Sequence, residues 1–238
     1  MSEVKAAPRG LLVDWGGVLT SGLEEALRRW AELDGFDFDS YLQAVLAWLP
    51  PEPDPARAEA DPARAEEGLD SVRAEAELNP VHALERGQLA VPDFERKLAS
   101  ILVRHDGTPV PAEGLIERMF AHFEHQPAMS ALVRRARQHG IRTALLSNSW
   151  GNTYPRDTWD GMFDDIVISG EVGLRKPEPE IFLLAARRLD LKPEECVFVD
   201  DLALNVDGAR ALGMTGILHT SYDETRRALE TLFGADLT

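Results

Sequence analysis

The sequence predicts an α/β fold, in which a parallel β-sheet carries helices on both faces and a helical segment is inserted after the first strand. From about residue 127 onward, short apolar runs alternate with stretches of helical spacing. This alternation is typical of a parallel sheet whose strands are joined by helices. Between residues 20 and 126 the pattern is mainly helical, which indicates a separate helical unit.

The first predicted strand covers residues 11–13 and ends at Asp14, which is followed by Trp15 and two glycines. Such a short apolar run is typical of a buried parallel strand. It buries nothing alone, so we expect it to join the later sheet. The stretch 21–35 predicts a helix with Ser21 as its N-cap and Gly35 near its end.

The predicted helical unit contains one unusual stretch, 50–78. It is rich in proline, alanine, arginine and glutamate, and it contains the near-repeat DPARAEA and DPARAEE. Because it has few large apolar residues, we expect a solvated excursion, part loop and part exposed helix. Helix resumes at 79–102. The predicted domains are an α/β core made of 1–19 and 127–238 and a helical cap made of 20–126.

The second part of the core alternates regularly. Strands are predicted at 141–148, 164–170, 196–201 and 215–220. Helices are predicted at 129–140, 179–191, 203–214 and 223–233. The carboxyl ends of parallel strands meet at one edge of a sheet, where ligands bind in folds of this class.

Composition narrows the class of protein. The 238 residues include 41 acidic and 25 basic side chains, a formal net charge of −16. This charge argues against a nucleic-acid-binding protein and against binding to an anionic membrane. No apolar run approaches the roughly 18–20 residues that span a bilayer. The single cysteine, Cys196, excludes an internal disulfide, and with no signal-peptide pattern the expected location is the cytoplasm.

Polar side chains follow four predicted strands. They are Asp14 after the first, Ser147 and Asn148 at the second, Arg175 and Lys176 after the third, and Asp200, Asp201 and Asn205 after the fourth. Carboxylates brought close together repel each other unless a cation or a proton lies between them. Mg²⁺ with oxygen ligands suits such a cluster, and a lysine opposite the metal suits a phosphate. For Arg175 the sequence leaves a surface role and a substrate contact equally open.

These residues, in this order and spacing, resemble the four motifs of the haloacid dehalogenase (HAD) superfamily, whose core is a Rossmann-like sheet. The stretch 169–218 includes SGEVGLRKPEPEIF and VFVDDLALNVDGARALGMTGIL. It is similar to the IA-type subfamily with a helical cap, which includes the N-terminal phosphatase domain of epoxide hydrolases and bacterial sugar-phosphate phosphatases. The cap is similar only through ERGQLAVPDFERKL.

The resemblance implies a hydrolase that uses covalent catalysis. Asp14 is then the nucleophile, which attacks phosphorus to give an aspartyl-phosphate. Lys176 neutralises charge on the nucleophile and the transition state. Ser147 and the backbone of Asn148 hold phosphoryl oxygens, and Gly17 belongs to the same substrate-binding group.

The resemblance also implies a Mg²⁺ site. Its ligands are the second carboxylate oxygen of Asp14, the backbone carbonyl of Gly16 and the carboxylate of Asp201, with Asp200 in the same metal shell. Asn205 supports the site by positioning Lys176 or a metal-bound water. The implied activity is a Mg²⁺-dependent phosphatase whose partner is a small phosphorylated metabolite.

One position departs from the usual family pattern. HAD phosphatases usually carry a second aspartate two residues after the nucleophile, where this sequence has Gly16. That aspartate protonates the leaving group, and general acid catalysis is typically worth about 10²–10⁴-fold. A good leaving group, such as an anomeric phosphate, needs less protonation.

Two alternatives stay open at this point. A catalytically silent binding or regulatory module is favoured by Gly16 and by the Ala/Arg/Glu-rich stretch, but Asp14, Lys176 and Asp201 count against it. A metal-independent 2-haloacid dehalogenase shares the nucleophile and also lacks the second aspartate. Such an enzyme has no need of the pair Asp200 and Asp201.

Overall fold

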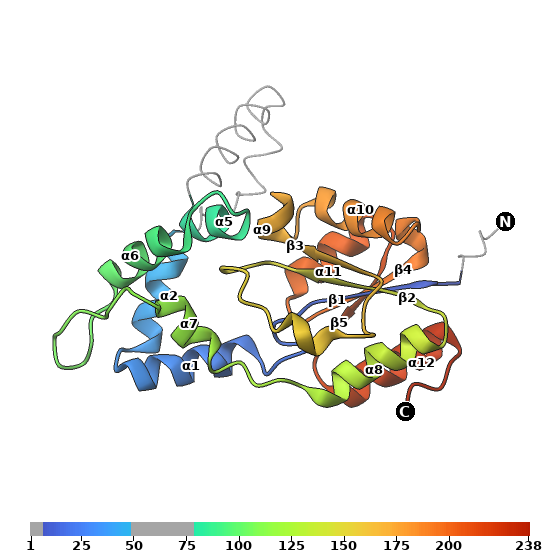
Figure 1. Cartoon of the computed structure of the whole chain (residues 1–238), viewed down its shortest axis with the longest axis horizontal. Helices are drawn as coiled ribbons and strands as arrows, with labels where there is room; N and C mark the ends of the chain where they lie inside the picture. The colour runs from blue at the N-terminus through green and yellow to red at the C-terminus, as the bar shows by residue number, and fades with distance from the viewer. Residues whose placement is uncertain (1–6, 49–78) are drawn as a thin grey trace, which may run out of the picture.

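The computed structural model describes residues 7–48 and 79–238 (Figure 1). Its sheet has five parallel strands in the order β3-β2-β1-β4-β5. The strands are β1 (Gly10–Val13), β2 (Arg142–Ser147), β3 (Asp165–Ile168), β4 (Cys196–Asp200) and β5 (Thr215–Leu218). The predicted α/β core is confirmed, and β1 lies at the centre of the sheet because β2 and β4 pair with its two edges.

Helices cover both faces of this sheet. The core helices are α8 (Pro127–Gln138), α9 (Ser169–Val172), α10 (Pro179–Arg188), α11 (Ala203–Ala211) and α12 (Tyr222–Phe233), with 3₁₀ turns at Arg156–Trp159 and Pro193–Glu195. Leu11 and Val13 of β1 pack with α8 and α12, whereas Leu12 packs with α10 and α11. This alternation is expected for a strand buried on both faces.

Beside the sheet lies a group of helices with its own apolar core (Figure 1). These helices are α1 (Leu23–Asp34), α2 (Phe38–Leu46), α5 (Pro80–Glu85), α6 (Val91–Ile101) and α7 (Leu115–Phe120). Trp30, Phe94 and Leu98 are fully buried at its centre. The predicted excursion at 50–78 lies outside the described residues. None of the helices in the described ranges is long and apolar enough to cross a bilayer, and the expected cytoplasmic location stays a prediction.

The chain leaves the sheet and returns to it through two neighbouring segments. Thr20 and His125 form an antiparallel bridge, and the N–H of Gln126 donates to the carbonyl of Leu19 over 2.9 Å. The two connections are therefore tied to each other at the base of the helical unit. The domain boundaries after residues 19 and 126 stay a prediction, which this pairing supports.

Two local predictions are wrong. The N-cap of α1 is Gly22, not Ser21, and the Ser21 hydroxyl instead accepts the N–H of Glu124 over 3.1 Å. The strand predicted at 164–170 ends early, because Ser169 begins the short helix α9 and donates its hydroxyl to the carbonyl of Glu85 over 2.5 Å. Ser21 joins the two connecting segments at the base of the helical unit, and Ser169 links that unit to the core. Such long-range contacts leave no mark in the local pattern.

Candidate active site

The strand register brings the predicted carboxylates together. Val13 of β1 pairs with Val199 of β4, so the residues that follow them, Asp14 and Asp200, lie side by side. The N–H of Asp14 also donates to the carbonyl of Val199 over 3.0 Å. One carboxylate oxygen from each of Asp14, Asp200 and Asp201 lies within 4.8 Å of the others.

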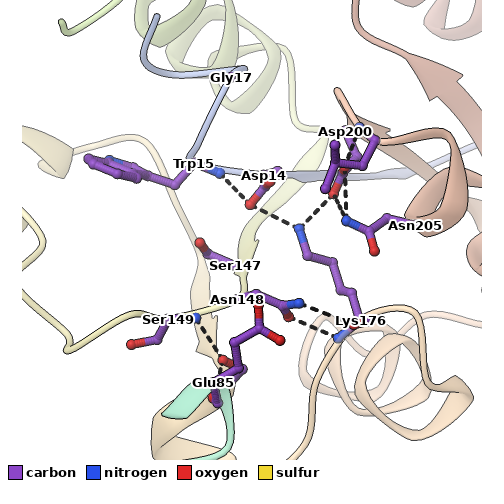
Figure 2. A network of polar contacts seen from close by, with 12 residues as sticks. Asp14, Trp15, Gly17, Glu85, Ser147, Asn148, Ser149, Lys176, Asp200 and Asn205 are labelled. Carbon is purple, nitrogen blue, oxygen red and sulfur yellow. Dashed lines mark hydrogen bonds and ion pairs between the residues drawn. The ribbon is translucent and has the colours of Figure 1, made fainter. Parts of the chain in front are cut away.

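Lys176 joins this cluster from the loop between α9 and α10. Its side chain is 1% exposed, and its Nζ lies 2.9 Å from Asp14 Oδ1 and 2.6 Å from Asp200 Oδ2 (Figure 2). Burial alone lowers the pKa of Lys176, but the charges of Asp14 and Asp200 outweigh it, so the pKa lies above its ordinary value. The ammonium therefore stays charged between the two carboxylates.

Two amide side chains fix the charged groups. Asn148 accepts the Lys176 N–H at its Oδ1 over 2.9 Å and donates its Nδ2 to the Lys176 carbonyl over 3.1 Å (Figure 2). Asn205 donates its Nδ2 to both oxygens of Asp200, over 3.0 and 3.1 Å. Asn205 thus contacts Asp200 directly, and it reaches Lys176 only through that carboxylate.

The two glycines after Asp14 have different surroundings. Gly17 has a φ of +68°, and a Cβ on it would lie 2.0 Å from Asp201 Oδ2, so the Asp201 carboxylate packs directly against its backbone. The Gly17 N–H donates to the Thr20 hydroxyl over 3.1 Å, and the predicted contact between Gly17 and substrate stays a prediction. Apart from its chain neighbours, no atom of the described residues lies within 4 Å of a Cβ on Gly16, and Gly16 borders the cavity described below.

Ser147 has a partner that the sequence did not indicate. Its Oγ lies 2.9 Å from the hydroxyl of Tyr154, which also donates to the carbonyl of Asn148 over 3.3 Å. Burial raises the pKa of Tyr154 above its usual range, so the phenol stays protonated. Tyr154 comes from an irregular loop with no motif, which is why the sequence offered no signal for it.

Negative charge is in excess at the site. Burial raises the pKa of Asp14 to about 7; Lys176 opposes the shift, while Asp200 and Asp201 add to it. Burial and the charge of Asp200 likewise raise the pKa of Asp201 to about 6. Clustered carboxylate oxygens that hold on to protons in this way are a donor set that fits a hard divalent cation such as Mg²⁺.

A cavity of about 270 Å³ lies above the carboxylates, between the sheet and the helical unit. Its floor is polar and contains Asp14, Gly16, Ser147, Asn148, Lys176, Asp201 and Asn205. Its wall is mainly apolar and contains Trp15, Leu23, Leu27, Tyr41, Leu42, Val45, Met119, Phe120, Phe123, Trp150, Tyr154 and Leu202, together with Glu85. The polar part of a ligand would therefore contact the floor of the cavity, and its apolar part would contact the wall.

Glu85 of α5 connects the wall to the loop that carries the lysine. Its Oε2 accepts Nε of Arg175 over 2.6 Å, and its Oε1 accepts Nε1 of Trp150 over 3.2 Å. Arg175 is therefore paired with Glu85 and its side chain is 15% exposed, while a contact with substrate stays untested. Glu85 is the first residue of ERGQL, the stretch that carried the weak similarity in the cap.

A known protein family and several solved structures match this chain. The family model of haloacid dehalogenase-like hydrolases matches residues 8–213. The chain belongs to this family. The HAD-like fold also appears in a HAD family enzyme from Bacteroides thetaiotaomicron, solved in complex with magnesium and inorganic phosphate. That structure has a TM-score of 0.55 at 19% identity and covers 90% of this chain and 94% of its own.

Named relatives of this HAD-like hydrolase include phosphatases. Bifunctional epoxide hydrolase 2 of Mus musculus is 32% identical over 126 residues, which is 50% of this chain and 23% of the mouse protein. The phosphoserine phosphatase of Thermus thermophilus is 32% identical over 137 residues, which is 54% of this chain and 55% of the relative. The aligned region is thus about half or less of each relative's length. The predicted resemblance to the HAD superfamily, including an epoxide hydrolase, is confirmed.

Proposed function

We propose that this HAD-like hydrolase is a Mg²⁺-dependent phosphatase of a small phosphorylated metabolite and works through an aspartyl-phosphate. One observation carries the proposal. At the end of the central strand, Asp14 lies 2.9 Å from the buried ammonium of Lys176, and its carboxylate clusters with those of Asp200 and Asp201. This combination serves a nucleophile that must approach an anionic phosphate.

The proposal assigns the metal to Asp14, Asp201 and the backbone carbonyl of Gly16, with Asp200 beside them. Asp200 is fully buried, and its oxygens already accept bonds from Lys176 and Asn205. Its main role is therefore to hold these two side chains in place. When bound, Mg²⁺ would supply positive charge next to the phosphoryl oxygens. The Bacteroides neighbour, solved with magnesium and phosphate, is consistent with this assignment.

In the proposed reaction, a carboxylate oxygen of Asp14 attacks phosphorus while the bond from phosphorus to the ester oxygen breaks. Lys176 balances the negative charge of the attacking carboxylate and of the transferring group. Ser147, the backbone of Asn148 and Gly17 are assigned to the phosphoryl oxygens. Water then hydrolyses the aspartyl-phosphate, which releases inorganic phosphate and restores Asp14.

A second candidate is a silent binding module, and the observation that favours it is Gly16. Position 16 carries no acid, and among the described residues no atom beyond its chain neighbours lies within 4 Å of a Cβ placed there. A 2-haloacid dehalogenase is less well supported. A metal-independent dehalogenase does not require three carboxylates whose oxygens lie within 4.8 Å of one another.

The test uses p-nitrophenyl phosphate, whose leaving group needs little protonation. We expect turnover with Mg²⁺, loss of turnover with EDTA, and loss in Asp14→Asn. The matched control is Asp207→Asn on α11, whose side chain is 67% exposed and lies outside the site. Turnover that ignores EDTA contradicts the Mg²⁺ assignment, and inactivity on a broad panel of phosphates favours the silent module.

A further inference from the structure

We propose that the substrates are aryl phosphates, namely phosphate monoesters of small, uncharged phenols. The inference rests on the proposed phosphatase function and adds the class of the alcohol. Two features carry it independently. One is the aromatic and aliphatic wall of the cavity, and the other is the glycine at position 16, where HAD phosphatases usually carry the acid that protonates the leaving group.

The wall suits a flat apolar ring. Trp15 follows the nucleophile directly and stacks on Phe123 with ring centroids 5.7 Å apart and planes 26° apart. Tyr154 meets Trp15 edge-on at 5.2 Å, and Phe120 lies 5.9 Å from Trp15. Aromatic rings favour such stacked and edge-on neighbours, so a further ring beside them gains both apolar burial and ring contacts.

The charged groups that line the cavity also favour an uncharged alcohol part of the substrate. Among the described residues that line the cavity, Lys176 is the only cation, and its ammonium is already bound by Asp14 and Asp200. Glu85 is the one acid of the described wall, and it is paired with Arg175. A carboxylate or an ammonium elsewhere on the substrate would lose its hydration here without gaining a partner.

The chemistry of the leaving group independently favours aryl phosphates. Gly16 replaces the usual acid, and Glu85 is occupied as an acceptor for Arg175 and Trp150. When the bond from phosphorus to oxygen breaks, the electron pair stays on that oxygen. A phenol has a pKa of about 10, so a phenoxide leaves without help and takes its proton from water, whereas an alkoxide is far more basic.

Size and access fit a substrate of one or two rings. The cavity of about 270 Å³ lies just below the range of about 300–1,000 Å³ that is usual for drug-sized ligands. Leu42 and Leu202 line it and are 41% and 46% exposed, so the apolar wall continues to the molecular surface. A ring can therefore enter along an apolar edge while the phosphate reaches the floor.

The decisive comparison holds the leaving group constant. Phosphotyrosine and 4-ethylphenyl phosphate release similar phenols, but phosphotyrosine also carries an ammonium and a carboxylate. We expect kcat/KM to be at least about tenfold higher for 4-ethylphenyl phosphate. In a binding measurement with Mg²⁺ present, phenylphosphonate should bind about 10- to 100-fold more tightly than methylphosphonate, because only its ring reaches the wall.

A pair of surface leucine variants assigns the effect to the wall. Leu42→Gln should lower kcat/KM for 4-ethylphenyl phosphate about 3- to 10-fold and leave inhibition by inorganic phosphate within about twofold, since phosphate reaches only the floor. The control is Leu33→Gln on α1, which is 64% exposed and lies outside the cavity. It should change neither value. Both leucines are exposed, so neither variant empties the core.

The outcomes separate the two proposals. Equal or faster turnover of phosphotyrosine, or equal binding of the two phosphonates, overturns the aryl inference and leaves the phosphatase proposal standing. Failure to hydrolyse every phosphate, p-nitrophenyl phosphate included, overturns the phosphatase proposal and the inference with it. A higher kcat/KM for 4-ethylphenyl phosphate than for phosphotyrosine, reduced in Leu42→Gln but not in Leu33→Gln, supports both the phosphatase proposal and the aryl inference.

Discussion

Gly17 offers a way to disturb the proposed metal site without touching a ligand. Gly17→Ala adds one methyl group, whose carbon would lie 2.0 Å from Asp201 Oδ2, whereas Cβ atoms do not approach other heavy atoms within 3.0 Å. The carboxylate must therefore move by about 1 Å. Ligand distances in metal sites vary by only about 0.2 Å, so this movement removes Asp201 from a site that it helps to form.

The expected loss is large enough to measure. Changes around metal ligands typically lower metal affinity about 10- to 100-fold, which corresponds to about 1.4–2.7 kcal/mol. Alanine in the left-handed conformation costs a further ~1 kcal/mol of folding stability, because Gly17 has a φ of +68°. The two costs appear in different measurements, the first in Mg²⁺ binding and the second in unfolding.

Gly35→Ala is the matched control. Gly35 ends α1 with a φ of +78°, but in the part of the chain that the structure describes a Cβ there meets no atom within 4 Å beyond its chain neighbours. It therefore reproduces the backbone strain without the clash. Calorimetric titration with Mg²⁺ should show weak binding for Gly17→Ala and unchanged binding for Gly35→Ala. Thermal unfolding in EDTA should show comparable destabilisation of both.

One result would refute this reasoning. If Gly17→Ala is folded, loses about as much stability as Gly35→Ala and still binds Mg²⁺ as tightly as the original chain, Asp201 is not a ligand whose position depends on Gly17. The assignment of the metal to Asp14 and Asp201 would then have to be abandoned.

Two further predictions concern protons. Gly16→Asp should raise kcat for alkyl phosphates about 10²-fold or more, because the open space at Gly16 admits the missing acid. The kcat for p-nitrophenyl phosphate should change little, since its leaving group needs little protonation. An unchanged kcat for alkyl phosphates would mean that another group donates the proton. Mg²⁺ titrations at pH 5.5 and 8 should show tighter binding at pH 8, because protons compete at Asp14 and Asp201, whose pKa values are raised to about 7 and about 6. Since the folded chain keeps protons there that the unfolded chain has lost, the unfolding free energy of the metal-free protein should fall between about pH 4 and 7 and recover with Mg²⁺. Binding and stability that are independent of pH across this window would contradict both expectations.

Much of the site followed from the sequence, for a physical reason. Parallel strands place their carboxyl ends at one edge, so Asp14 and Asp200 meet once the strands are recognised. Lys176 is buried against Asp14 and Asp200, and its predicted place opposite a metal stays a prediction. These features depend on short apolar runs and on the residues directly after them, and both can be read locally.

The parts that the sequence missed depend on contacts between distant segments. Tyr154 reaches Ser147 from a loop, and Glu85 meets Arg175 across 90 positions of the chain. The cavity wall likewise joins α1 and α2 to loops of the core. Arg175 and Glu85 lie in stretches that resemble the family, but no local pattern pairs them or singles out Tyr154, so only the folded chain reveals these contacts.

The pairing of Glu85 with Arg175 limits how this protein can be recombined. Arg175 directly precedes Lys176, and the Glu85 carbonyl is also bound by Ser169, so the helical unit is anchored beside the residue that carries the central positive charge. A chimera that received another helical insertion without an acid at this place would remove the 2.6 Å partner of Arg175 and leave it only Glu178, at 4.0 Å. Exchange of the insertion between relatives should therefore succeed only when both halves of this junction are transferred together.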